Sequence, residues 1–337
     1  MDNFLNSLIC RHTFNTQELI DTYPPKIYNQ NKQIVYNMTC PPGSKHQGNL
    51  IFSRWNAMEI PQVLSISENN TKFDQKNGYF DYKTSVNNSK NDIEWYLNFA
   101  AKDLFYAYGG SLFAQDEMQV TEHPALASLR EALIDKEIKP WTVENREPAP
   151  ILIRGVERKC AIATEPNAKK GRPLGLYGNN FAKATPAAIQ QAIEIINPPT
   201  ITNILAIEAP VGGYGIYSQA EIEYILKTAY TGFIAAKIES WLEIKRLPKV
   251  IIHTGFWGCG AYGGNRVLMV ILQLLAATLS QIDKLVFHLG DTTGIAAFTN
   301  AQQIFQELLS NSNQIEIDDL IEKIYAMEFE WGVSDGN

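Results

Sequence analysis

The stretch that decides the fold is Thr254 to Asn265, which reads Thr-Gly-Phe-Trp-Gly-Cys-Gly-Ala-Tyr-Gly-Gly-Asn. Glycine is costly in chain entropy, and it is needed where φ is positive or where a bulky group must reach the backbone. Two isolated glycines would indicate an ordinary turn, whereas five around Trp257 and Tyr262 favour a binding loop. These five are Gly255, Gly258, Gly260, Gly263 and Gly264.

The residues on either side of this glycine loop predict a strand before it and a helix after it. The apolar run 250–252 comes first, and the longer apolar run 267–279 follows. A glycine loop that enters a helix presents unpaired amides and the positive end of the helix dipole, which suits a phosphate. No Gly-Lys-Ser/Thr follows and there is no clean dinucleotide fingerprint. The sequence therefore predicts a nucleotide-type anion site of another class.

The glycine loop resembles the phosphate-binding loop of the poly(ADP-ribose) glycohydrolase family of macrodomains, Thr-Gly-Asn-Trp-Gly-Cys-Gly-Ala-Phe-Gly-Gly-Asp. Nine of the twelve positions agree, and the departures are Phe256, Tyr262 and Asn265. The resemblance implies that the segment from Gly258 to Gly264 holds the diphosphate of ADP-ribose. The residues it assigns to this contact are Gly258, Cys259, Gly260, Ala261, Tyr262, Gly263 and Gly264.

A second constellation is the glycine turn Gly109-Gly110 followed by Gln115-Asp116-Glu117. An acidic pair at a helix start, taken alone, indicates favourable pairing with the helix dipole. The same family carries a glycine run followed by Gln-Glu-Glu. The resemblance thus implies that Glu117 is the catalytic acid and that Asp116 orients the substrate. This chain has two glycines where the family has three, and its spacer to the acids is shorter.

Other segments match the family in the same order along the chain. Asn98 begins a segment similar to the family's Asp-Phe-Ala-Asn, with Ala101 in the Asn position, and Asn98 is a candidate substrate contact. Residues 205–209 and 227–233 resemble two further family segments, so the resemblance runs from about residue 95 to residue 289. Tyr177 and Phe181 lie in a later loop, where they are candidates either to cover the adenosine or to pack in the core.

Composition narrows the classes of protein that fit. The chain has 337 residues, 45% of them hydrophobic, and a net charge of −7. An acidic chain is not expected to bind nucleic acid in general, because the nucleic-acid backbone is negatively charged and binds basic surfaces. The four cysteines show no Cys-x-x-Cys pairing, so neither a metal site nor a disulfide framework is expected. The N-terminus lacks signal-peptide features and no apolar run is long enough for a membrane span, which predicts a cytoplasmic protein.

Strands and helices are expected to alternate from residue 92 onward. Apolar runs predict strands at 95–100, 159–163, 203–207, 250–252 and 285–289; helices are expected at 115–134, 219–241 and 267–279, with one or two more within 301–337. Earlier, 33–36 and 50–52 are short strand-like runs. Nearly continuous apolar strands are typical of a sheet covered on both faces.

With the resemblance, the prediction is an α/β fold, a macrodomain-like three-layer α/β/α arrangement with a central mixed sheet. Residues 1–90 would be an N-terminal extension packed on a catalytic domain formed by 91–337. The implied function is hydrolysis of the ribose C1″ linkage in ADP-ribose polymers or ADP-ribosylated proteins, with no cofactor or metal. Two alternatives stay open: a non-catalytic ADP-ribose reader, and a hydrolase of a small ADP-ribosyl compound or of ADP-ribosylated nucleic acid.

Overall fold

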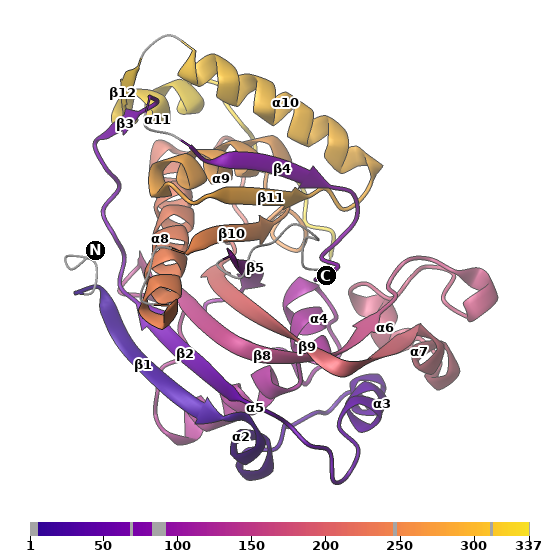
Figure 1. Cartoon of the computed structure of the whole chain (residues 1–337). Helices are drawn as coiled ribbons and strands as arrows, with labels where there is room; N and C mark the ends of the chain where they lie inside the picture. Colours follow the sequence, from indigo (N-terminus) through magenta and orange to yellow (C-terminus); the bar gives the residue numbers. More distant parts are fainter. Residues whose placement is uncertain (1–5, 68–69, 83–91, 245–247, 311–312, 337) are drawn as a thin grey trace.

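The computed structural model describes residues 6–67, 70–82, 92–244, 248–310 and 313–336, and its centre is one long sheet (Figure 1). The described chain contributes eight strands to it, in the order β1-β2-β8-β9-β5-β10-β11-β4. Pairing is antiparallel from β1 to β9 and parallel from β9 to β4, so the sheet is mixed. The strands are β1 (Leu8–Asn15), β2 (Asn49–Trp55), β4 (Lys72–Lys76), β5 (Asp92–Ala100), β8 (Ile151–Ile162), β9 (Ile193–Glu208), β10 (Lys249–Thr254) and β11 (Lys284–His288).

Alternate residues of the central strands enter two different cores, one on each face of the sheet. In β5, Trp95 and Leu97 belong to one core, whereas Tyr96 and Ala100 belong to the other. The helices divide in the same way, which makes three layers. The first face is covered by α8 (Gln219–Ile244), α9 (Arg266–Ser280), α10 (Thr292–Leu309) and α11 (Ile317–Tyr325), and the second by α2 (Thr16–Thr22), α4 (Gln115–Glu122) and α5 (Ala125–Asp135).

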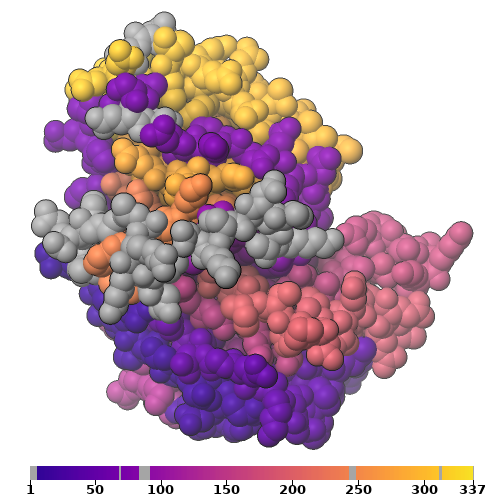
Figure 2. All heavy atoms as spheres, in the orientation of Figure 1, coloured from indigo at the N-terminus to yellow at the C-terminus, as the bar shows by residue number. Residues whose placement is uncertain are grey.

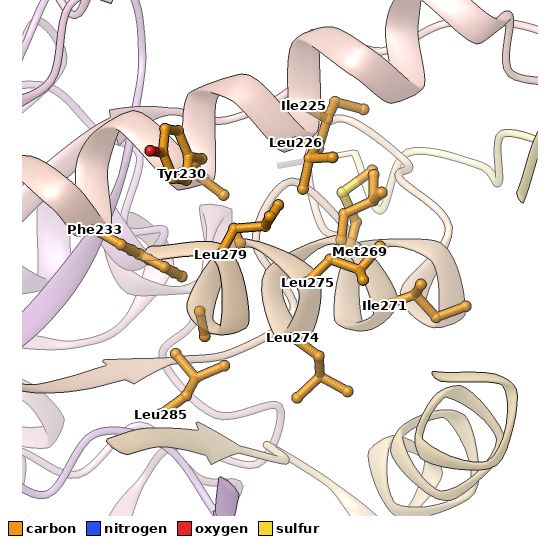
Figure 3. Packing of buried hydrophobic residues seen from close by; sticks show 14 of the residues in the cluster. Ile225, Leu226, Tyr230, Phe233, Met269, Ile271, Leu274, Leu275, Leu279 and Leu285 are labelled. Atoms are coloured by element: carbon orange, nitrogen blue, oxygen red, sulfur yellow. The ribbon is translucent and has the colours of Figure 1, made fainter. Parts of the chain in front are cut away.

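Helix α9 lies between α8 and α10, and it is buried from Leu268 to Ser280. Figure 3 shows Phe233 of α8 and Leu279 of α9 in the packing between the two helices, and Leu274 on the side of α9 nearer the sheet. A helix that is apolar nearly all round is one enclosed by other elements. The helix that follows the glycine loop is therefore held rigidly.

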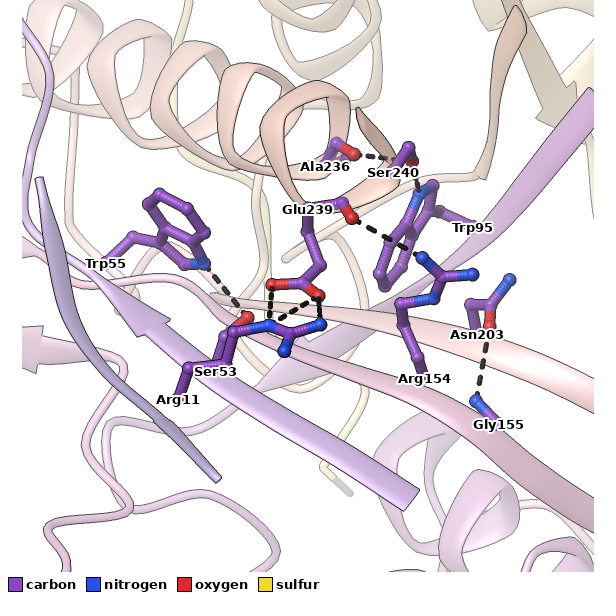
Figure 4. Close-up of polar contacts among 10 residues, drawn as sticks. All are labelled: Arg11, Ser53, Trp55, Trp95, Arg154, Gly155, Asn203, Ala236, Glu239 and Ser240. Carbon is purple, nitrogen blue, oxygen red and sulfur yellow. Dashed lines mark hydrogen bonds and ion pairs between the residues drawn. The ribbon is translucent and has the colours of Figure 1, made fainter. Parts of the chain in front are cut away.

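The first ninety residues supply strands at both ends of the sheet. Strands β1 and β2 form one edge, and β4 forms the other beside β11. Strands from both sides of the expected boundary at residue 90 thus pair directly. Arg11 of β1 also reaches α8, where its Nη2 lies 2.9 Å from Oε1 of the fully buried Glu239 (Figure 4). The remaining early elements are α3 (Gln30–Thr39) and β3 (Val63–Ser65).

Strands β8 and β9 continue beyond the sheet as a long hairpin. Cys160 and Ile195 still pair there, and the segment between the strands carries short helices. In Figures 1 and 2 this part, with α6 and α7, projects from the body of the molecule. The smaller elements are α6 (Asn179–Lys183), α7 (Pro186–Ala192), a 3₁₀ turn (Ala168–Lys170), and the short strands β6 (Val143–Glu144), β7 (Glu147–Pro148) and β12 (Gln314–Glu316).

Most of the expected elements are present, and three differ. The predicted strand at 33–36 is wrong, because these residues lie inside α3, which Asn29 caps by accepting hydrogen bonds from the amides of residues 31 and 32. The predicted helix at 115–134 is two helices, α4 and α5, divided at His123-Pro124. Within the stretch 301–337, where only helices were expected, residues 314–316 form the short strand β12. None of the described helices combines the length and apolar content needed to cross a membrane.

Candidate functional site

Three loops meet at one edge of the sheet, where the parallel strands β9, β5 and β10 end. Loops that follow adjacent parallel strands gather at the carboxyl edge of a sheet, which is the usual place for ligand binding in α/β folds. A Cβ built on Gly258 would lie 2.7 Å from Cδ of Pro210, and one on Gly212 would lie 2.8 Å from the carbonyl oxygen of Tyr262. The loop after β9 therefore packs directly against the glycine loop after β10.

The glycine loop has the backbone of an anion site. Gly258 and Gly263 have φ values of +73° and +65°, which branched residues rarely adopt. The amide of Gly264 donates to the carbonyl of Gly258 at 2.9 Å, which closes the loop on itself. Among the described residues nothing accepts a hydrogen bond from the amides of Gly260, Ala261 or Tyr262. Three successive unpaired amides form a concave set of donors that suits a phosphate.

The loop leads into α9, whose first turn is capped by Asn265. The Asn265 side chain accepts from the amides of Val267 and Leu268 at 3.1 and 3.2 Å. An oxygen at the N-cap satisfies amides that the helix leaves unpaired. The cap fixes the direction in which the glycine loop joins the helix.

Cys259 lies within this loop as a packing residue. Its Sγ is 3.6 Å from the carbonyl oxygen of Trp257. Burial raises the pKa of the Cys259 thiol far above its usual range, and Arg266 lowers it only in part. A thiol that stays protonated is a poor nucleophile. Its geometry fits a small side chain that supports the loop.

The acidic pair lies at the start of α4, beneath the end of β5. Asp116 and Glu117 are only 8% and 3% exposed. Asn98, which is fully buried in β5, donates through Nδ2 to Oδ1 of Asp116 at 3.0 Å and to Oε1 of Gln119 at 2.9 Å. A carboxyl group held by a buried amide has a fixed orientation. Asn98 thus joins the strand to the acidic pair.

Gln115 attaches the first turn of α4 to the same strand. Its Oε1 accepts from the amide of Phe99 at 2.8 Å, and its Nε2 donates to the carbonyl of Leu97 at 3.0 Å. These two bonds take the place of the backbone hydrogen bonds that a neighbouring strand would make. The Gln115 side chain therefore fixes the position of α4, which carries the two acids, relative to β5.

One oxygen of Glu117 is bonded and the other is open. Oε2 accepts from the amide of Ala114 at 3.0 Å, where it satisfies a donor at the beginning of α4. Oε1 has no hydrogen-bond partner in the described part of the chain. A carboxyl group with one fixed and one open oxygen can exchange a proton with a ligand without losing its position.

The electrostatic environment of the pair favours a protonated carboxyl group. Burial raises the pKa of Asp116 to about 7, and the charge of Glu117 adds to this rise. The hydrogen bond from Asn98 and the positive charges of Lys32 and Arg130 lower the pKa, but less strongly. Two neighbouring carboxyl groups in a buried site resist carrying two negative charges at once. The site can hold a proton near neutral pH.

The glycine turn is shaped by the N-terminal segment. A Cβ on Gly109 would collide with the carbonyl oxygen of Lys26, and the amide of Tyr28 donates to the carbonyl of Gly109 at 2.9 Å. Gly110 has more room, since a Cβ there would lie 3.5 Å from the carbonyl oxygen of Ala107. Gly109 is therefore required by close chain packing inside the protein.

Lys32, from α3, is a site residue that the sequence did not indicate. It is 2% exposed, and its Nζ donates to the carbonyl of Tyr108 at 2.8 Å, next to the glycine turn. Burial lowers the pKa of Lys32 to about 8, while the negative charges of Glu117 and Asp116 raise it. A lysine in a polar segment of sequence is normally expected to be exposed to solvent. Only the packing of α3 against α4 shows that Lys32 is buried near the acidic pair.

The two aromatic candidates occupy different environments. Phe181 is fully buried and stacks on Phe113, with ring centroids 3.8 Å apart, so it takes the packing alternative that the sequence left open. Tyr177 is half-buried at the glycine loop. A Cβ on Gly260 would lie 3.4 Å from its hydroxyl oxygen. Tyr177 is therefore the aromatic side chain that faces the candidate anion site.

The acidic pair and the glycine loop lie within electrostatic range of each other. Burial raises the pKa of Tyr262, and the charges of Glu208, Asp116 and Glu117 raise it further. The charge of Glu117 also contributes to the raised pKa of Tyr177. The structure therefore brings the acidic pair, Tyr177 and the glycine loop to one edge of the sheet, whereas Phe181 packs in the core and Gly109 packs against Lys26. No group of three or more metal-ligating side chains lies together in the described parts of the chain.

Comparison with known proteins supports the resemblance seen in the motifs. Residues 176–295 match the family model described as poly(ADP-ribose) glycohydrolase, macro domain fold. This segment includes the glycine loop and Tyr177, and it begins after the acidic pair. The macrodomain-like α/β fold with a mixed central sheet is thereby confirmed.

Solved structures of similar proteins carry the same family name. One is poly(ADP-ribose) glycohydrolase from Thermomonospora curvata, at 14% identity and a TM-score of 0.39, with 89% of this chain and 88% of that chain covered. Another is poly(ADP-ribose) glycohydrolase from Deinococcus radiodurans in complex with ADP-ribose, at 12% identity and a TM-score of 0.43, with 92% and 99% covered.

Proposed function

We propose that this chain, whose residues 176–295 match the poly(ADP-ribose) glycohydrolase family model, is an ADP-ribosyl hydrolase. It would cleave the linkage at the ribose C1″ of ADP-ribose polymers or ADP-ribosylated proteins. The observation that carries the proposal is the meeting of two features at one sheet edge. These are a glycine loop with three successive unpaired amides, Gly260 to Tyr262, and a buried acidic pair, Asp116 and Glu117.

The glycine loop would hold the diphosphate and thereby place the ribose over α4. Backbone amides bind phosphate oxygens without a mobile side chain, so the ligand position is set by the loop itself. Correct placement of reactants accounts for a large part of many enzymatic accelerations. In this proposal, binding affinity depends mainly on the loop after β10, and turnover depends mainly on the helix after β5.

Glu117 would act as general acid and then as general base. The acidic pair would share one proton, which Glu117 carries in the reactive state. As the bond between C1″ and the leaving oxygen breaks, Glu117 gives this proton to that oxygen, and the ribose takes on oxocarbenium character. The resulting carboxylate then accepts a proton from the water that attacks C1″, which restores the starting state. The open Oε1 supports this role, while Oε2 keeps the carboxyl group attached to the Ala114 amide.

The test is the pair of variants Glu117→Gln and Glu223→Gln. We expect Glu117→Gln to keep ADP-ribose affinity and to lose roughly 10²–10⁴-fold in turnover, the usual contribution of general acid–base catalysis. Glu223 lies exposed on α8 and serves as the matched control; Glu223→Gln should leave both the ADP-ribose affinity and the turnover unchanged. Turnover is followed as free ADP-ribose released from poly(ADP-ribose), mono-ADP-ribosylated protein and a small O-linked ADP-ribosyl ester. A Glu117→Gln rate within about threefold of the original would exclude this catalyst.

A non-catalytic ADP-ribose reader is the second candidate, and the glycine turn favours it. Gly109 is held against Lys26 by the N-terminal segment, and the turn has two glycines in place of three. A displacement of about 1 Å at a reacting group can cost roughly 10²-fold in rate. The reader hypothesis predicts ADP-ribose binding by calorimetry together with no release from any of the three substrates.

A further inference from the structure

The C-terminal segment returns from α11 and crosses the glycine loop. Its path begins where Tyr217 donates its amide to the carbonyl of Phe329 at 2.9 Å and Trp331 donates to Gly215 at 2.8 Å. The amide of Gly332 then donates to the carbonyl of Gly263 at 2.7 Å. In Figure 1 the C-terminus lies close to the ends of β5 and β10, above α4. The last described residues thus lie on the candidate anion site.

Trp331 anchors this segment. Its ring stacks on Tyr217 with centroids 4.1 Å apart and planes inclined by 18°. It also contacts Gly213, where any Cβ would collide with the indole. The position of the residues beyond Trp331 is therefore constrained from one end.

Beyond the anchor, the chain lies flat on the glycine loop. A Cβ on Gly263 would lie 2.9 Å from both the carbonyl oxygen of Gly332 and the amide nitrogen of Ser334. The amide of Asp335 donates to the carbonyl of Gly260 at 3.3 Å. The contacts of the C-terminal segment with Gly260 and Gly263 use loop carbonyls and leave the unpaired loop amides available to an acceptor.

The carboxylate of Asp335 is an anion at this place. A Cβ on Gly260 would lie 3.0 Å from Asp335 Oδ2 and 3.4 Å from the hydroxyl oxygen of Tyr177. Burial raises the pKa of Tyr177, and among the charged groups Asp335 raises it most. A carboxylate therefore lies beside the loop where the proposed function places a phosphate of the ligand.

We propose that residues 332–336 form an autoinhibitory tail, in which the Asp335 carboxylate lies beside the anion position of the glycine loop and repels a diphosphate ligand until the tail leaves. The inference rests on the proposed function, since it concerns the same site. Because a tethered competitor acts at a high effective concentration, even a weak contact lowers the apparent affinity of a ligand. Residues 332–336 are exposed to solvent, which allows them to leave without disturbing the core.

Two variants test the tail directly. Asp335→Asn removes the charge, and a chain that ends at Trp331 removes the tail while keeping its anchor. We expect Asp335→Asn to tighten ADP-ribose binding by roughly fivefold, which corresponds to about 1 kcal/mol, and the shortened chain to tighten it further. Glu328→Gln is the matched control, because it removes one exposed charge just before the anchor. Binding is measured by calorimetry, and thermal melting verifies that each variant is folded.

Two results overturn the inference. If the dissociation constant is unchanged in both variants, the tail does not compete; if binding weakens, the tail helps to hold the ligand. Hydrogen exchange gives a second readout, since ligand binding should speed exchange of the tail amides and slow exchange of the loop amides.

Inorganic pyrophosphate separates the failure of the tail from that of the proposed function. If no form of the protein binds ADP-ribose but the shortened chain binds pyrophosphate more tightly than the full chain, the function is wrong and the tail inference stands. Equal binding of pyrophosphate by both chains, or binding by neither, overturns the tail.

Discussion

At the scale of single residues, Asp116 links the site to the stability of the whole protein. Its pKa is raised to about 7, above the unfolded value of about 3.9. Between these two values the native state binds more protons than the unfolded state, so the free energy of unfolding falls as pH rises through this range. Well above pH 7, where Asp116 is ionised in the native state as well, the protein carries the full cost of the buried charge.

Asp116→Asn should therefore stabilise the protein at high pH. The amide carries no charge, and we expect the free energy of unfolding to rise by about 1–3 kcal/mol at pH 8. The gain should shrink towards zero near pH 4, where the native aspartic acid is protonated as well. Thermal melting of both proteins across this pH range is the measurement. A gain of equal size at pH 4 and pH 8 would contradict the raised pKa.

Lys32 is expected to control the protonation of Asp116. Its positive charge lowers the pKa of Asp116, and its ammonium group is bonded to the Tyr108 carbonyl. We expect Lys32→Met to move the titration of Asp116 upward, because loss of a nearby positive charge favours the protonated carboxyl group. The carboxyl ¹³C shift of Asp116 reports this titration, and Lys45→Met on the exposed surface is the control. An unmoved titration would show that Lys32 does not act on the pair.

At the scale of elements, β1 is attached to α8 by a charge in the interior. Glu239 is fully buried, and Arg11 Nε and Nη2 both donate to its carboxylate (Figure 4). Removing one partner of a buried pair leaves a charge without compensation, which costs more than the pair itself contributes. The attachment of the edge strand is therefore sensitive to a single substitution.

Arg11→Met should destabilise the protein by about 2–3 kcal/mol, because it leaves the buried Glu239 carboxylate without its counter-charge. The double variant Arg11→Met/Glu239→Gln should recover a large part of this loss, since an amide needs no counter-charge. Urea unfolding of the two single variants and the double variant gives the coupling energy. Strictly additive losses would show that the two side chains do not depend on each other.

The elements differ in how far the sequence predicts them. Strand β5 and helix α9 could be predicted because each has a continuous apolar run that tertiary packing then uses. The strand predicted at residues 33–36 was wrong. Ile34 and Val35 favour strands, but the Asn29 cap and the contacts of α3 with other helices determine the local structure. Intrinsic preference is a weak signal in a polar segment, and tertiary context overrides it.

At the scale of the whole molecule, the site draws on the beginning, middle and end of the chain. The motifs and the family resemblance indicated Asn98, Asp116 and Glu117, and the structure brings these three together. Lys32 and Asp335 could not be predicted in the same way. Each lies in a segment without periodicity, and its position depends on contacts with residues far away in sequence.

The parallel pairing of β4 with β11 also has a consequence for synthesis of the protein. Lys72 pairs with Lys284, so β4 cannot join the sheet until β11 has been made. Roughly 200 residues separate the two, and ribosomes need about 10–40 s to add them at 5–20 residues per second. During that interval β4 has no neighbour, while β1 and β2 can already pair with each other. The segment that forms β4 thus stays unpaired on the nascent chain until β11 is synthesised. We expect chaperones that bind unpaired strands to bind this segment during that interval.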